Sequence, residues 1–349
     1  MHVREPNVGA PSRSALTAAA DRVRPHLKRR PPPLSVAFEP ALASIRHVTL
    51  SAHPGRAPDG VASRYRRWVR ITPRYDGPPV LRFEMPAADP SVPVLRQRRR
   101  LGAVISGLSD DQWSTPSRCE GWSVQDVVAH LIGTDQFWAA SISAGLAGAP
   151  TRYLASFDPV VTPPQMVDGL RSMASSEVAA RYLETVDALT QLLGHLDEAE
   201  WSRPAEAPPG HIAVHAVALH ALWDAWIHER DIVLPLGLEP TLEDDEVAGC
   251  LRYAAALGPA FLASAGSPRR GSLTVAATEP EVLFVVDVGS TVAVSDVSTV
   301  PDGPCLAGPA VELTEGLSFR GPLDHGLDVT DQWLLGGLGE VFEQRRGSG

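Results

Sequence analysis

Two histidines and two aspartates lie within the short segment HALWDAWIHERDI, residues 220–232. Asp224 and His228 are four positions apart, so on a helix their side chains point toward one spot. A carboxylate and an imidazole in this arrangement can supply two ligands to a divalent metal ion. The same spacing is also common in ordinary helical hydrogen bonds, so the pair alone leaves a metal site and a structural contact both open.

A helical projection of residues 211–232 separates the apolar side chains of this segment from its polar ones. The apolar residues share one sector: Leu219, Leu222, Trp223, Trp226 and Ile227. The polar residues form a single stripe along the border of that sector: His220, Asp224, His228 and Asp231. The polar stripe therefore follows the edge of the packing face, where another helix could add a third ligand.

His130, in the segment VVAHLIG, is the natural candidate for that third ligand. On its own helical projection it lies at the edge of the core-facing stripe, next to Thr134 and Trp138. A lone histidine in this position is more often a hydrogen-bonded core residue. Together with the Asp224–His228 pair, however, it predicts a metal site of three residues. Three protein ligands leave a coordination position for water or substrate, as in catalytic zinc sites.

Residues around these three have alternative assignments or none. Asp231 could hydrogen-bond the second ring nitrogen of His228, pair with Arg230 or cap the helix. His220 is either a group behind the ligands or a plain hydrogen-bonded histidine. Neither His211 nor His215 is assigned a role.

The loop SRCEG, residues 117–121, lies between Trp113 and Trp122. We interpret the two tryptophans as hydrophobic staples at a helix start, with a lid beside the site as the alternative. Cys119 could be a reactive thiol, because a nearby helix N-terminus lowers the pKa of a thiol. An unreactive loop cysteine is the favoured interpretation.

Helical periodicity dominates the chain from about residue 93 to residue 264. Ser123 is expected to cap the second helix, with Asp126 completing a capping box. Residues 197–210 are expected to form a loop. The helices are predicted at residues 92–108, 121–146, 165–196 with a break near Ser175, 211–233 and 242–264.

The sequence changes character after residue 267. Short β-branched runs predict strands at residues 272–278, 282–289 and 291–298, followed by helices at 309–319 and 328–344. The predicted fold is therefore mainly α: a helical bundle within residues 85–264, followed by a small α/β domain over residues 268–345.

Residues 1–84 differ from the rest of the chain in charge and proline content. They carry a net charge of about +9, whereas residues 85–349 carry about −19. Frequent prolines predict a mostly disordered basic leader. An upstream start codon before Met85 would explain such a segment. A basic arm for nucleic acid or an acidic membrane is the alternative, and the acidic remainder of the chain argues against nucleic-acid binding.

Cysteine usage and hydropathy bear on the compartment. The three cysteines are far apart in sequence and form no CxxC motif, which favours reduced thiols: Cys119, Cys250 and Cys305. No run of about 18 apolar residues predicts a membrane span, and no apolar segment follows the first charges as in a secretory signal. We therefore expect a cytoplasmic protein that does not bind membranes.

Two motifs carry a family resemblance. LSDDQWSTPSRCEGWSVQDVVAHL, followed about 90 residues later by HALWDAWIHERDI, resembles the mycothiol-dependent maleylpyruvate isomerase family, within the DinB-like four-helix-bundle metalloenzymes. The similarity runs from roughly Leu95 to Arg345, and CLAGPAVELTEGLSFR resembles the family's strand-then-helix segment. The resemblance implies a DinB-like four-helix bundle and a small C-terminal α/β domain.

The family's metal ligands are one histidine and a carboxylate–x–x–x–histidine pair, and they match His130, Asp224 and His228. Many members carry glutamate where this chain has Asp224. The resemblance further implies a divalent ion, Zn²⁺ above all, and mycothiol as thiol cosubstrate, bound between the bundle and the C-terminal domain. In the isomerase reaction the thiolate adds to a cis double bond, the adduct rotates, and elimination gives the trans product. Related members transfer low-molecular-weight thiols to other small electrophiles.

Two classes of function therefore remain. The first is a metal-dependent thiol transferase or isomerase with a small-molecule substrate. The second is a non-catalytic bundle that binds a ligand or partner, in which the polar stripe is only structural. The metal content of the three-residue site separates them.

Overall fold

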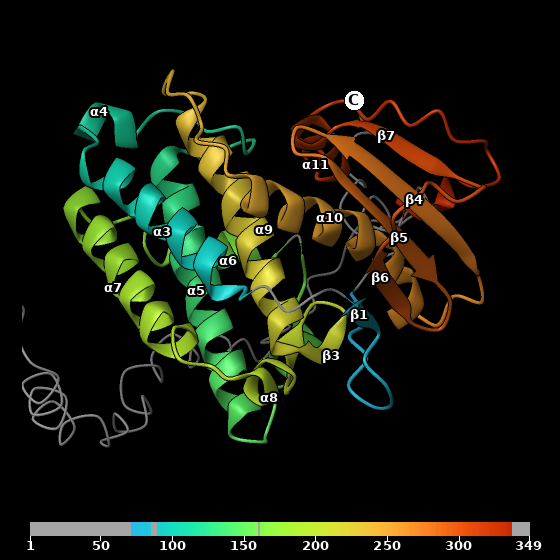
Figure 1. Ribbon diagram of the computed structural model, residues 1–349. Coiled ribbons are helices and arrows are strands. Elements are labelled where there is room, and N and C mark those ends of the chain that lie inside the picture. Colours follow the sequence, from blue (N-terminus) through green and yellow to red (C-terminus); the bar gives the residue numbers. More distant parts are fainter. Residues whose placement is uncertain (1–70, 85–88, 160, 337–349) are drawn as a thin grey trace, which may run out of the picture. The chain divides into compact units, whose positions relative to one another are not determined.

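The helical part of the protein is a four-helix bundle (Figure 1). The computed structural model describes residues 71–84, 89–159 and 161–336, all of which belong to the unit Gly60–Gly349. Helices α3 and α5 lie diagonally opposite each other, and each packs against both α7 and α9. This arrangement confirms the predicted mainly α fold. The four helices are α3 (Ser91–Ser106), α5 (Val124–Leu146), α7 (Ser175–Leu193) and α9 (Val214–Val233).

The start of α5 is fixed as the sequence predicts. The Ser123 hydroxyl accepts a hydrogen bond from the Asp126 backbone N–H at 3.2 Å, and the Asp126 carboxylate accepts one from the Ser123 backbone N–H at 3.0 Å. This capping box satisfies two N–H groups that the helix itself leaves unpaired. It fixes where α5 starts, and His130 follows within its second turn.

The predicted third helix is divided into two. Helix α6 (Thr162–Asp168) ends before α7 begins at Ser175, where the sequence indicated a break. Three single-turn helices complete the bundle's connections: α4 (Asp110–Trp113), η1 (Tyr153–Ser156) and α8 (Glu198–Trp201).

A hairpin precedes α9 where the sequence indicated a loop and the first residues of a helix. Strands β2 (Pro204–Ala207) and β3 (Gly210–Ala213) pair in antiparallel fashion, so α9 begins at Val214 rather than at residue 211. Gly210 has φ +126°, and a Cβ there would collide with the backbone of Arg74. The strands are too short for a recognisable alternation, so the sequence does not indicate them.

Buried polar groups hold this hairpin in place. The Glu206 side chain is fully buried and accepts hydrogen bonds from the Tyr75 and Thr151 hydroxyls, both at 2.6 Å. The backbone N–H groups of Tyr153 and Leu154 also donate to it, at 2.9 and 2.8 Å. Four donors compensate the desolvation of one carboxylate, so Glu206 joins segments that are distant in sequence.

The C-terminal part is a five-stranded mixed sheet with one following helix, which confirms the predicted α/β domain. The strand order is β1-β6-β5-β4-β7, with β4, β5 and β6 antiparallel and both edge strands parallel to their neighbours. Helix α11 (Ala310–Leu317) follows β7 directly. The strands that follow the bundle are β4 (Gly271–Thr278), β5 (Val282–Val288), β6 (Val292–Asp296) and β7 (Cys305–Pro309).

Helix α10 (Asp244–Ser264) belongs to both parts of the fold. It packs against α9 on the bundle side and against α11, β5 and β6 on the other. Among the described residues it is long and apolar enough to cross a membrane by length and composition, but 72% of the relevant window is buried in the fold. Its apolar character is accounted for by packing on two sides.

The prediction of a disordered leader over residues 1–84 is wrong for its last four residues, which form a strand. Strand β1 (Leu81–Glu84) forms one edge of the sheet and pairs in parallel with β6, Leu81 opposite Val292. A four-residue strand between prolines has almost no local signal, and its partner is about 200 residues away in sequence. The expectation for residues 1–70 lies outside the described residues, as does the end of the helix predicted at 328–344.

Removing β1 is expected to destabilise the protein. Val80, Leu81 and Phe83 are buried, and burial of one such side chain is worth about 1.5–3 kcal/mol. A chain beginning at Met85 should therefore show a markedly lower free energy of unfolding in urea than a chain beginning at Ile71. Equal midpoints and slopes for the two chains would contradict the assignment of β1 to the fold.

Candidate metal centre

His130 from α5 meets Asp224 and His228 from α9 at one point of the bundle. The Asp224 Oδ1 atom lies 3.7 Å from His228 Nε2 and 4.0 Å from His130 Nε2. The two imidazole rings are 4.8 Å apart, nearly perpendicular. One ligand atom from each residue lies within 4.8 Å of the other two. The structure thus brings together the three residues predicted from sequence, a set we call the triad.

Two polar atoms of the triad are buried and have no hydrogen-bond partner in the described part of the chain. They are Asp224 Oδ2 and His130 Nδ1. Burial alone would raise the pKa of Asp224, but the neighbouring His130 and His228 outweigh it and hold the pKa well below its usual range. Burial is also the main reason why the pKa of His130 is lowered. The triad therefore combines an ionised carboxylate with a neutral imidazole at His130.

The second ring nitrogen of His228 is held by Asp231, as one of the sequence alternatives proposed. His228 Nδ1 lies 3.0 Å from Asp231 Oδ2. Burial would lower the pKa of His228, but Asp231, Cys119 and Asp224 together raise it to about 10. In the absence of a metal ion, His228 is thus an imidazolium that donates its Nδ1 proton to Asp231.

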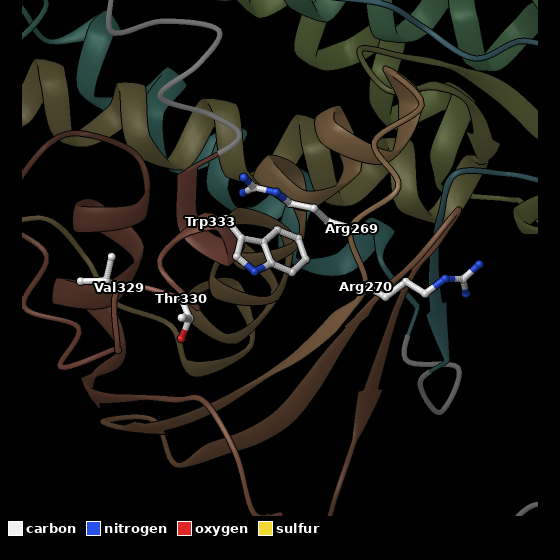
Figure 2. Close-up of a pocket in the computed structure, with 5 residues that line it drawn as sticks. All are labelled: Arg269, Arg270, Val329, Thr330 and Trp333. Atoms are coloured by element: carbon white, nitrogen blue, oxygen red, sulfur yellow. The ribbon is translucent and has the colours of Figure 1, made fainter.

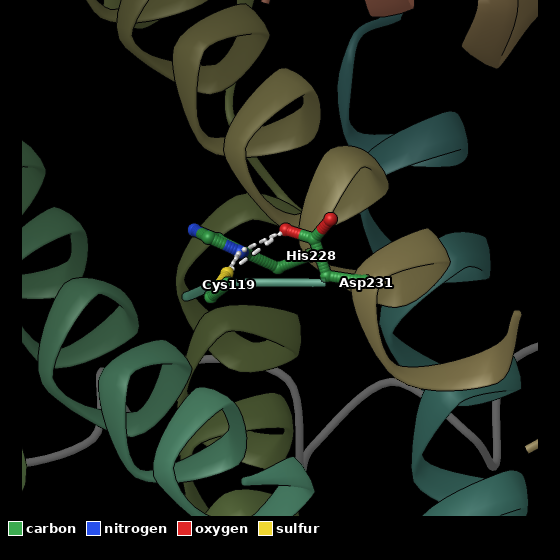
Figure 3. A group of neighbouring side chains, drawn as sticks. All are labelled: Cys119, His228 and Asp231. Carbon is green, nitrogen blue, oxygen red and sulfur yellow. Dashed lines mark hydrogen bonds and ion pairs between the residues drawn. The ribbon is translucent and has the colours of Figure 1, made fainter. Parts of the chain in front are cut away.

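Cys119 forms a second cluster with His228 and Asp231 (Figure 3). Its Sγ atom lies 3.2 Å from Asp231 Oδ2 and 3.7 Å from His228 Nδ1. His228 therefore turns Nε2 toward the triad and Nδ1 toward this cluster. No local pattern in the sequence places a loop cysteine from before α5 against the end of α9.

Arg320, just beyond α11, completes the second cluster. Its Nε atom donates to both Asp231 oxygens, at 2.9 and 3.1 Å, and its Nη2 donates to Asp231 Oδ2 at 2.9 Å. The same Nη2 lies 3.5 Å from Cys119 Sγ. Arg320 was not among the residues predicted from sequence, because only the tertiary fold brings it to α9.

Further contacts bind the end of α11 to the bundle. Glu315 accepts hydrogen bonds from Arg118 at 2.8 Å and Arg230 at 2.7 Å. The Trp223 indole N–H donates to the Ser318 hydroxyl at 2.9 Å. The C-terminal part of the chain thus contacts α9 both just before Asp224, at Trp223, and just after His228, at Arg230.

The tryptophans and the other histidines considered in the sequence lie at different points of the fold. Trp113 is a core residue, as a staple should be, whereas the ring of Trp122 lies 5.5 Å from that of His130. His220 Nδ1 is 2.5 Å from the Tyr253 hydroxyl, and His211 Nε2 is 2.8 Å from the Thr151 carbonyl. His211 and His215 are not part of the triad.

Two surface hollows lie away from the triad, on the C-terminal part of the chain. The larger, about 430 Å³, is bordered by Arg269, Arg270 and Trp333 (Figure 2), and the smaller, about 210 Å³, shares Arg270 and Trp333 with it. The Arg269 guanidinium lies 5.5 Å from the centre of the Trp333 ring. These hollows contain none of the triad residues.

Fold and site together define a helical-bundle protein with two histidines and one carboxylate gathered from two helices. Residues 94–233 match the family model described as mycothiol maleylpyruvate isomerase N-terminal domain. This match to residues of the bundle confirms the resemblance seen in the motifs.

The solved structures that resemble this chain have low sequence identity to it. Two solved structures, of the mycothiol-dependent maleylpyruvate isomerase and of a histidine-to-alanine mutant, are 15% and 14% identical in sequence to this chain. Each comparison has a TM-score of 0.49 and covers 68% of this chain and 91% of the other. The comparison with curated proteins gives no match.

The electrostatics predict opposite protonation states for two histidines of α9. In metal-free protein at about pH 8, His228 should remain protonated, with a pKa of about 10, and His220 should remain neutral, with a pKa of about 4. The raised pKa of His228 stabilises the fold fully below about pH 6.5, and this contribution is lost as pH rises toward 10. NMR titration of the ring carbons, assigned with His228→Gln and His220→Gln, measures both. A His228 resonance that titrates between pH 6 and 7 would contradict the Asp231 contact.

Proposed function

We propose that His130, Asp224 and His228 bind a catalytic divalent metal ion. Two imidazole nitrogens and one carboxylate are a common ligand set of catalytic zinc sites. The buried, unpartnered Asp224 Oδ2 supports the proposal, because a buried carboxylate oxygen without a partner is costly unless a cation or donor compensates it. Nitrogen and oxygen donors together favour zinc over calcium or magnesium.

The alternative metal cluster, Cys119 with His228 and Asp231, is less suitable. The Arg320 guanidinium already contacts both Asp231 oxygens and approaches Cys119 Sγ. A metal ion in that cluster would lie next to a fixed positive charge, which opposes its binding. Among the described residues no arginine or lysine is hydrogen-bonded to the triad, so it is the better metal site.

In this proposal Asp231 is a positioning residue. His228 donates its Nδ1 proton to Asp231. Once Nε2 has lost its own proton, its lone pair points toward Asp224 and His130, where the metal ion would bind. Histidine ligands of metal ions usually have such a carboxylate or carbonyl partner. Arg320 holds the same Asp231 carboxylate, so the ring orientation of His228 depends on a residue beyond α11.

We further propose that the protein is an enzyme of the mycothiol-dependent maleylpyruvate isomerase type. The match of residues 94–233 to that domain family supports this, as does the ligand set of the triad. A bound zinc ion lowers the pKa of a coordinated thiol, which would make mycothiol a thiolate nucleophile near neutral pH. The second substrate would be a small electrophile, which is isomerised or receives the thiol. Three free cysteines favour a cytoplasmic location.

The metal content of the purified protein tests the site directly. We expect about one zinc ion per chain by mass spectrometry of metals, because three ligands converge at the triad. His228→Ala and Asp224→Ala should each weaken zinc binding by more than about 100-fold in a chelator competition. Asp231→Asn should have a smaller effect, about 10–100-fold, because it removes only the partner of a ligand.

His195→Ala is the matched control, since His195 is exposed and outside the triad. It should bind zinc as the wild type does. A wild-type protein without metal affinity would instead support a non-catalytic bundle whose polar stripe is structural.

The reaction is tested with mycothiol and two classes of acceptor. We expect zinc-loaded protein either to isomerise maleylpyruvate or to conjugate mycothiol with a small electrophile, because the ion would supply a thiolate. Removal of the metal and the His228→Ala variant should each abolish the activity, while His195→Ala should retain it. Activity that survives metal removal would contradict a metal-activated thiol.

A further inference from the structure

Trp138 and His220 form a second pair of facing side chains between α5 and α9. Their ring centres are 4.6 Å apart. Trp138 follows His130 by two helical turns, and His220 precedes Asp224 by one turn, or about 6 Å along the helix. The pair therefore occupies the next level of the same helix interface that holds the triad.

Tyr253 of α10 sets the tautomer of His220. The Tyr253 side chain is fully buried, and His220 Nδ1, at 2.5 Å, is the only hydrogen-bond partner of its hydroxyl among the described residues. A buried hydroxyl proton needs an acceptor, so the Tyr253 O–H donates to Nδ1. Burial lowers the pKa of His220 to about 4, so the ring is neutral and carries its single proton on Nε2.

The N–H groups of the pair have no acceptor within the described structure. Trp138 is 3% exposed, and its buried Nε1–H has no hydrogen-bond partner. His220 is 6% exposed, and its Nε2 also makes no hydrogen bond to a described residue, although it is not fully enclosed. An unpartnered buried donor such as Trp138 Nε1–H is rare in folded proteins and calls for an acceptor from outside the chain.

We propose that Trp138 Nε1–H and His220 Nε2–H bind a carboxylate or carbonyl oxygen of the small molecule that reacts at the triad. The inference rests on the proposed function and deepens it, since it assigns the substrate an acceptor group about one helical turn from the metal. A divalent ion on Asp224 and two neutral imidazoles would leave the triad with a net positive charge, which favours an anionic ligand. The two neutral N–H groups next to the triad would orient this ligand through hydrogen bonds without adding charge.

The binding of maleate, a small cis-dicarboxylate, to the zinc-loaded full chain tests this subsite by calorimetry. His220→Phe and Trp138→Phe should each weaken maleate binding by about tenfold or more, the usual effect of losing a hydrogen bond to a charged group. Both should keep the zinc content of the wild type. His220→Gln, which retains an N–H near the Nε2 position, should restore most of the affinity. Tyr253→Phe removes the hydroxyl that keeps the His220 proton on Nε2. It should therefore weaken maleate binding through the tautomer alone, because Trp138 and His220 themselves are unchanged.

His215→Phe and Trp201→Phe are the matched controls, because they change the same residue types outside the pair, and neither should alter maleate affinity. Unchanged affinity in both His220→Phe and Trp138→Phe, or a wild type that does not bind maleate, would overturn the subsite. So would a failure of His220→Gln to bind better than His220→Phe. A wild type that binds no zinc would overturn the proposed function and this inference together, whereas zinc binding with unaltered maleate affinity overturns the subsite alone.

Discussion

The buried carboxylate of Asp231 is the interaction on which the rest of the site depends. Its side chain is fully buried, and a buried charge is costly unless it is paired and hydrogen-bonded. His228, Arg320 and Cys119 contact its two oxygens, and its backbone carbonyl accepts a hydrogen bond from the Arg118 N–H. One charge thereby holds α9, the loop before α5 and the segment after α11 in a single arrangement.

In this arrangement the two ring nitrogens of His228 have different charged neighbours. Nδ1 faces Asp231, which is paired with the cationic Arg320, whereas Nε2 faces the anionic Asp224. In the proposed metal site the position of the guanidinium favours the triad over the second cluster, because like charges repel strongly at such short distances. The sheet and α11 therefore contribute to the site through the charge they place beside α9, in addition to their packing.

Much of this was readable in the sequence because it depends on neighbours along the chain. Helical periodicity, the capping box of Ser123 and Asp126, and the four-residue spacing of Asp224 and His228 are all local properties. His130 could be added because a buried polar stripe on one helix needs partners on another. The motifs around these residues were sufficient to indicate the domain family that residues 94–233 match.

The sequence by itself thus determined the helices, the type of fold and the three side chains that meet in the bundle. Only the tertiary structure decided what surrounds them. Arg320 and Cys119 reach Asp231 from about 90 and 110 residues away, and β1 joins the sheet beside β6 across about 200 residues. The physical reason is that such contacts follow from the packing of whole elements, so no local spacing records them.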